Sequence, residues 1–183
     1  MWIVRLLPMI LAALVAGMPG AARALDVDLE LVLAVDVSGS IEKDEAELQR
    51  EGFVQAFRNE AVIRAVTSGE HKRIAVTYIE WAGVSHQRMG IDWRLIDSAE
   101  AAHGFAAELS NLPFASALWT SISGAIDFGM DRLGASPYRS KRRVIDISGD
   151  GANNHGEAVL PARDRAVRQG VTINGLPIVN GRP

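Results

Sequence analysis

One apolar run in the first third of the chain restricts the choice of fold. Residues Leu29–Val35 (LELVLAV) are almost all apolar, and the run ends at Asp36. A strand that is apolar on both faces must be covered on both faces, which happens in a parallel sheet between two layers of helices. The run therefore predicts a strand buried inside such a sandwich.

Strand-like and helix-like segments alternate along the rest of the chain. Four further runs predict strands, namely Arg73–Ala82, Gln87–Ile96, Lys141–Ser148 and Val171–Val179. Periodicity and stop signals predict helices over Glu42–Val66, Ser98–Leu112, Thr120–Leu133 and Glu157–Gln169, the last with Pro161 as an alternative start. A short turn around Gly83–His86 predicts that the second and third strands pair antiparallel at a sheet edge. The alternation predicts an α/β fold with a mostly parallel sheet and helices on both faces.

The first 24 residues resemble a secretory signal. Arg5 supplies the positive charge, Leu6–Met18 the apolar stretch, and Ala22-Arg23-Ala24 an A-x-A cleavage site. The apolar stretch is well short of the roughly 20 residues that span a bilayer. We therefore expect cleavage after Ala24, export to a bacterial periplasm or beyond, and no membrane span in the mature chain. Residues 1–24 are then the signal peptide, and 25–183 form one domain.

Composition excludes several classes of function. The 183 residues include no cysteine, which excludes disulfides, thiolate metal sites and cysteine nucleophiles. The formal net charge is −3, whereas a nucleic-acid binder is usually basic. No nucleic-acid partner is expected.

Oxygen-bearing side chains follow two of the predicted strands. Asp36, Ser38 and Ser40 alternate after the first strand, and Asp150 follows the Lys141–Ser148 strand. Thr120 begins the helix between them. Sites in such folds lie at the carboxyl ends of the strands, so these five side chains are expected to converge. Hard oxygen ligands predict a divalent cation, in the first place Mg²⁺, with Mn²⁺ or Ca²⁺ as alternatives.

The types of these side chains also indicate a role. Hydroxyl groups are neutral and leave much of the charge of the cation uncompensated. A cation held in this way is expected to accept one more anionic oxygen from outside the chain.

The pattern Asp36-x-Ser38-x-Ser40, followed by Thr120 and Asp150, resembles the metal-ion-dependent adhesion site of von Willebrand factor type A domains. The resemblance covers Leu29–Val179. It implies a Rossmann-like three-layer sandwich with strand order 3-2-1-4-5-6, and a non-enzymatic module that binds an Asp or Glu carboxylate of a protein partner through its cation. The chain reaches only the fifth strand, so the resemblance also implies that the sixth strand and a final helix are missing. We therefore expect a C-terminally incomplete domain with Val171–Val179 at a sheet edge, and marginal solubility.

Two alternatives come from other classes of protein. The segment from Asp36 to Ser40, with Gly149–Asn153, also resembles a haloacid-dehalogenase-like phosphatase in which Asp36 is the nucleophile. That family places an aspartate as general acid where this chain has Ser38, and a serine of ordinary pKa cannot do that work. A phosphate-binding loop is the other alternative, but the chain lacks the G-x-x-x-x-G-K-[ST] motif.

The sequence does not decide the roles of several further residues. Asp146 lies in the middle of a strand, and a buried carboxylate there needs a partner that the sequence does not identify. Core packing is the favoured role for Trp81, whereas Trp119 fits the core and the rim of the site equally well. His155 is read as a solvated loop residue with the rim as the alternative, and Asn153 and Asn154 as optional supports of their loop.

Overall fold

A five-stranded sheet forms the centre of the computed structural model, which describes residues 24–39 and 43–178. Its strands are β2 (Glu30–Asp36), β3 (Ile74–Trp81), β4 (Gln87–Ile96), β6 (Arg143–Gly149) and β7 (Val171–Pro177). The order across the sheet is β4-β3-β2-β6-β7. Only the β3–β4 pair is antiparallel among these strands. Numbered by the five strands predicted from the sequence, this order is 3-2-1-4-5, which agrees with the first five positions of the predicted order.

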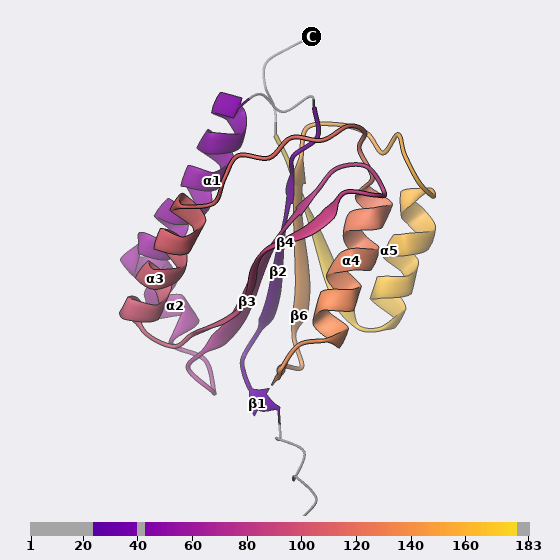
Figure 1. Cartoon of the computed structure of the whole chain (residues 1–183). Helices are drawn as coiled ribbons and strands as arrows, with labels where there is room; N and C mark the ends of the chain where they lie inside the picture. The colour runs from indigo at the N-terminus through magenta and orange to yellow at the C-terminus, as the bar shows by residue number, and fades with distance from the viewer. Residues whose placement is uncertain (1–23, 40–42, 179–183) are drawn as a thin grey trace, which may run out of the picture.

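Helices cover both faces of the sheet (Figure 1). One layer holds α1 (Lys43–Arg58), α2 (Glu60–Val66) and α3 (Ala99–Ser110), and the other holds α4 (Ile122–Gly134) and α5 (Val159–Arg168). The predicted α/β three-layer sandwich is therefore confirmed. None of the helices in the described part of the chain is long and apolar enough to cross a membrane.

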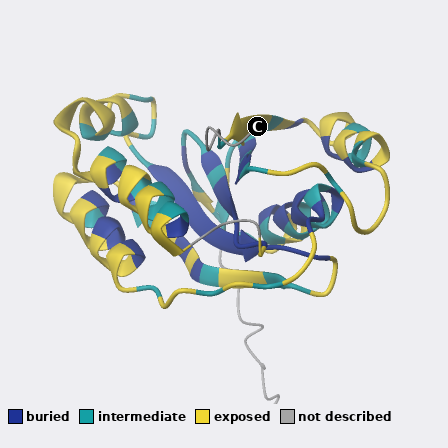
Figure 2. Cartoon of the chain, turned by 90° about the horizontal axis from the view of Figure 1, so that it is seen from above, coloured by how far each residue is buried: buried dark blue, intermediate teal, exposed yellow. Residues whose placement is uncertain are grey.

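Alternate residues of β2 enter two separate cores. Val32 and Ala34 pack in the cluster that includes Ile126 of α4, whereas Leu33 and Val35 pack with Phe57 of α1. The central strands are dark blue between helices whose outer faces are yellow (Figure 2). A run of consecutive apolar residues is thus explained by burial on both faces.

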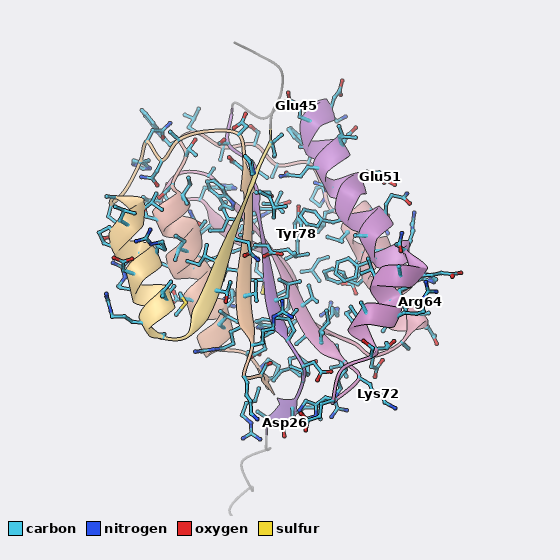
Figure 3. The ribbon with its side chains drawn as sticks, turned by 180° about the vertical axis from the view of Figure 1, so that it is seen from behind. Asp26, Glu45, Glu51, Arg64, Lys72 and Tyr78 are labelled. Atoms are coloured by element: carbon cyan, nitrogen blue, oxygen red, sulfur yellow. The ribbon has the colours of Figure 1, made fainter. Side chains whose placement is uncertain are left out.

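Tyr78 illustrates the core beneath α1. Its ring lies between the sheet and α1 (Figure 3) and is almost completely buried. The ring of Phe53 meets it edge-on, with 6.4 Å between the ring centroids. Burial raises the pKa of the Tyr78 hydroxyl well above its usual range.

A second, two-stranded sheet was not predicted. It pairs β1 (Leu25–Asp26) with β5 (Tyr138–Arg139) in parallel, and Asp26 forms an ion pair with Arg139. The strands are only two residues long, too short for a pattern of hydrophobicity to reveal. The pair lies at the end of the molecule opposite the carboxyl ends of the parallel strands (Figure 1).

Several predicted boundaries were wrong. The expected helix over 42–66 is two helices that meet at Asn59, whose side chain caps α2. The other helices are shorter than predicted, and α4 begins at Ile122, so Thr120 lies in the loop before it. The last strand ends at Pro177, and Val179 lies outside the described residues. As predicted, β7 is at an edge of the described sheet, but reduced solubility remains a prediction.

Candidate metal centre

Asp36 is the last residue of β2, and its side chain is fully buried. Its Oδ1 accepts a hydrogen bond of 2.7 Å from the backbone N–H of Ser38. Its Oδ2 has no hydrogen-bond partner among the described residues. A Cβ atom added to Gly149 would lie 2.8 Å from this Oδ2, so the absence of a side chain there leaves room for the carboxylate.

Burial dominates the electrostatics of Asp36. It raises the pKa of the carboxyl to about 6, against the stabilising hydrogen bonds from the backbone and hydroxyl of Ser38. The negative charge of Asp150 raises this pKa further, whereas the backbone N–H of Asp150 lowers it, so Asp36 and Asp150 interact electrostatically. Two carboxylates near one another favour a cation between them.

The Thr120 loop runs beside the Ser38 loop. Ser38 and Ala117 form a parallel β-bridge, and the Ala117 N–H donates to the Val37 carbonyl at 2.9 Å. Thr120 is held on its other side, because its N–H donates to Asn154 Oδ1 at 2.8 Å and its carbonyl accepts from the Asn154 N–H at 2.9 Å. These contacts place the buried residues Ser38 and Thr120 along one shared hollow.

Asp150 lies between two glycines that contact other parts of the site. Gly149 faces Asp36, and a Cβ atom added to Gly151 would lie 3.7 Å from Thr120 Oγ1. The loop after β6 therefore passes close to both the Asp36 carboxylate and the Thr120 hydroxyl.

The structure brings Asp36, Ser38, Thr120 and Asp150 together at one end of the sheet, whereas Ser40 lies outside the described residues. These side chains fit a divalent cation, because a buried carboxylate oxygen without a partner is balanced best by a positive charge. No group of three or more His, Cys, Asp or Glu residues in the described part of the chain could hold a metal. The predicted ligand set differs from such a group, because it combines two carboxylates with hydroxyl groups.

The structure places the residues whose roles the sequence did not decide. Trp81 is buried in the core, as favoured. Asp146 Oδ1 accepts a 2.7 Å hydrogen bond from Asn174 Nδ2 of β7, which the sequence could not identify as its partner. Trp119 is exposed at the rim, where its ring is 5.6 Å from that of His155.

The two asparagines of the β6–α5 loop are more important than predicted. Asn154 holds Thr120, and Asn153 Oδ1 accepts from the Ser123 N–H at 3.2 Å in the first turn of α4. Their adjacency to Asp150 was the sole sequence signal, and loop amides are too common for it to be specific.

Comparisons with known proteins agree with this architecture. The family whose sequence profile matches residues 26–183 is described as "Protein of unknown function (DUF1194)". No curated protein matches the chain.

Solved structures with the same fold include proximal thread matrix protein 1 from the mussel byssus, with a TM-score of 0.66 and 17% identity over 87% of this chain and 40% of that one. Another structure of that protein has a zinc-occupied MIDAS motif, with a TM-score of 0.62 and 14% identity over 84% of this chain and 39% of that one. The pilus adhesin SpaC from Lactobacillus rhamnosus GG has a TM-score of 0.60 and 16% identity, over 82% of this chain and 24% of that one.

The chain spans at most 40% of the length of these solved structures, and identities this low show a shared fold alone. The sequence profile covers nearly the whole chain, and the sheet order, the helical layers and the neighbours agree on one architecture. The chain belongs to the family described as a protein of unknown function (DUF1194), and its fold is that of a von Willebrand factor type A domain.

Proposed function

We propose that this chain is an exported, non-enzymatic binding module that uses a divalent cation, Mg²⁺ in the first place, to capture an Asp or Glu carboxylate of a protein partner. Asp36, Ser38, Ser40, Thr120 and Asp150 would hold the cation. The observation that carries the proposal is the buried Asp36 Oδ2, which has no hydrogen-bond partner among the described residues and lies at the end of the sheet where Ser38 and Thr120 line one hollow.

The chain's own residues prepare this site before any ligand arrives. The Ser38 N–H orients Asp36 through Oδ1, whereas Oδ2 faces Gly149 and has no hydrogen-bond partner among the described residues. Asn154 fixes the backbone of Thr120, which limits where its hydroxyl can lie. A bound divalent cation would supply the positive charge that draws in a carboxylate oxygen of the partner.

The neighbouring structures support the adhesion-type function. One carries a zinc-occupied MIDAS motif, and another is a pilus adhesin. The phosphatase alternative lacks comparable support, because the residue two positions after Asp36 is a buried serine, which cannot act as the general acid.

Thermal and urea unfolding with Mg²⁺, Mn²⁺, Ca²⁺ or EDTA tests the metal centre. At 100 times its dissociation constant, the cation should raise the free energy of unfolding by about 2.7 kcal/mol. Thr120→Val should lose most of this gain because it replaces the hydroxyl with a methyl group. Thr172→Val is the matched control, since Thr172 is exposed on β7, and should keep the full gain. Identical unfolding of the wild-type protein with Mg²⁺ and EDTA would contradict the proposal.

A pair of assays separates binding from catalysis. Immobilised protein should retain partners from a periplasmic extract in Mg²⁺ and release them in EDTA. The same preparation should not hydrolyse an aryl phosphate. Mg²⁺-dependent hydrolysis that Asp36→Asn abolishes would instead establish the phosphatase.

A further inference from the structure

An apolar surface adjoins the candidate metal centre. The side chains of Leu118 and Trp119 are 75% and 60% exposed, immediately before Thr120 in the chain. They line a hollow of about 330 Å³, and the other lining residues are Ser38, Gly39, Thr120 and Asn154. Two large apolar side chains therefore share a hollow with two of the proposed ligands.

The backbone holds these apolar side chains in an unusual position. Trp119 has a φ of +71°, a conformation that a bulky residue seldom adopts and that persists only where its surroundings enforce it. The enforcing contacts flank it directly. The Gly83 N–H donates to the Leu118 carbonyl at 3.1 Å, and the Ser121 N–H donates to the Ala82 carbonyl at 2.8 Å.

The turn after β3 completes the support. A Cβ atom added to Gly83 would lie 2.8 Å from the Leu118 carbonyl oxygen and 3.0 Å from Trp119 Cβ, so the two loops approach as closely as a glycine allows. The ring of His155 lies 5.6 Å from that of Trp119, and its Nδ1 accepts from the Val84 N–H at 3.1 Å. Two loops, the turn after β3 and the loop after β6, thus hold Trp119 while leaving much of it exposed to solvent.

We propose that Leu118 and Trp119 form a subsite for a large apolar side chain directly next to the partner's Asp or Glu in sequence. The inference rests on the proposed function, because the acidic residue would reach the cation. Successive Cα atoms of a peptide are 3.8 Å apart, so a residue next to that acidic residue lies within reach of Leu118 and Trp119, which line the same hollow as Ser38 and Thr120. A rigid, exposed tryptophan is the kind of residue that contributes most to binding energy at interfaces.

Four peptides test the subsite against the metal centre. The probes are acetyl-Gly-Phe-Asp-Phe-Gly-amide, its analogue with Ser in place of both Phe residues, and the versions of each with Asn in place of Asp. In Mg²⁺, the wild-type protein should bind the Phe-Asp-Phe peptide about tenfold more tightly than the Ser-Asp-Ser peptide. Both Asn versions should bind much more weakly, and EDTA should abolish the difference between the Asp peptides.

Paired variants assign the preference to named residues. Leu118→Ser combined with Trp119→Ser should reduce the tenfold preference to about onefold, with the Mg²⁺-induced rise in melting temperature retained. Leu48→Ser is the matched control, since Leu48 is 74% exposed on α1, and should keep the preference.

The outcomes distinguish the two proposals. Equal Mg²⁺-dependent binding of both Asp peptides would overturn the subsite and leave the proposed function standing. The subsite proposal would also be overturned if the Phe-Asp-Phe peptide still bound in EDTA and the Phe-Asn-Phe peptide bound equally well. The apolar surface would then act independently of the cation. No effect of Mg²⁺ on either unfolding or peptide binding would overturn both proposals.

Discussion

At the scale of single residues, Asp36 is a carboxyl group whose ionisation is costly in the absence of metal. Its carboxyl is fully buried, and burial raises its pKa to about 6, well above that of an aspartate in the unfolded chain. The folded protein therefore holds this proton more tightly than the unfolded chain does. Stability from this group is fully present below the unfolded pKa and is lost as the pH rises through about 6.

This gives a pH-dependence prediction. The free energy of unfolding of the metal-free protein should contain a component that falls by about 2 kcal/mol between pH 4 and pH 7. Urea unfolding in chelator at several pH values measures it. The variant Asp36→Asn cannot ionise at this position and should lack the component. A wild-type curve that parallels the Asp36→Asn curve across this range would show that the carboxyl is not perturbed.

At the scale of elements, Asn59 divides one helical pattern into two helices. Its Oδ1 accepts from the backbone N–H groups of Ala61 at 2.8 Å and Val62 at 3.4 Å, which caps α2. Asn59→Ala should lower the free energy of unfolding by about 1 kcal/mol because it leaves these donors without the cap. Asn59→Asp keeps an acceptor and should be near wild type in the same urea titration. Equal loss in both variants would show that the amide has another role.

Arg50 joins α1 to the sheet and to the loop after α3. Its guanidinium donates to the carbonyls of Leu112 and Pro113 and lies 3.9 Å from Glu80, which is fully buried on β3. Arg88 also pairs with Glu80 from β4. The contact between α1 and β3 is therefore ionic at Arg50 and Glu80, in addition to the apolar packing between these elements.

Removing the charge of Arg50 should be costly. Arg50→Met should lower the free energy of unfolding by about 3 kcal/mol, because the buried Glu80 loses one of its two cationic partners. Arg58→Met, on the exposed end of the same helix, should change it by less than about 0.5 kcal/mol. Similar unfolding curves for the two variants would show that the contacts of Arg50 contribute nothing specific.

At the scale of the whole molecule, the two ends of the sheet differ in role. The carboxyl ends of β2 and β6 carry the candidate metal centre, and the opposite end carries the short β1–β5 pair. The proposed cleavage point after Ala24 lies directly before β1, so removal of the signal would leave the pairing of Leu25 with Tyr138 possible.

The whole chain is predicted to be exported with removal of its first 24 residues. Expression of the full chain in a bacterium should yield a periplasmic or secreted product whose mass corresponds to residues 25–183. Ala24→Lys should block cleavage, because signal processing requires a small residue there, and should leave the longer form. A wild-type product that retains residues 1–24 would contradict the proposed signal peptide.

Local patterns in the sequence determined the architecture and most of the candidate site. The run Leu29–Val35 indicated a strand covered on both faces, and β2 does enter two cores. Asp36 and Ser38 follow that apolar run in the sequence, which indicated that both lie at the carboxyl end of the strand. The carboxyl ends of parallel strands share one edge of the sheet, and sites in such folds lie there. These features depend on short-range periodicity and on the direction of strands, which the sequence itself carries.

The tertiary structure alone decided the contacts that shape the site. Thr120 is held by Asn154, Asp146 is paired with Asn174, and the exposed position of Trp119 depends on Gly83. Each pair joins residues far apart in the chain, and each uses residue types that are common in loops and strands. No periodicity links such residues, because their proximity follows from how the sheet aligns β3, β6 and β7 and the loops that these strands carry.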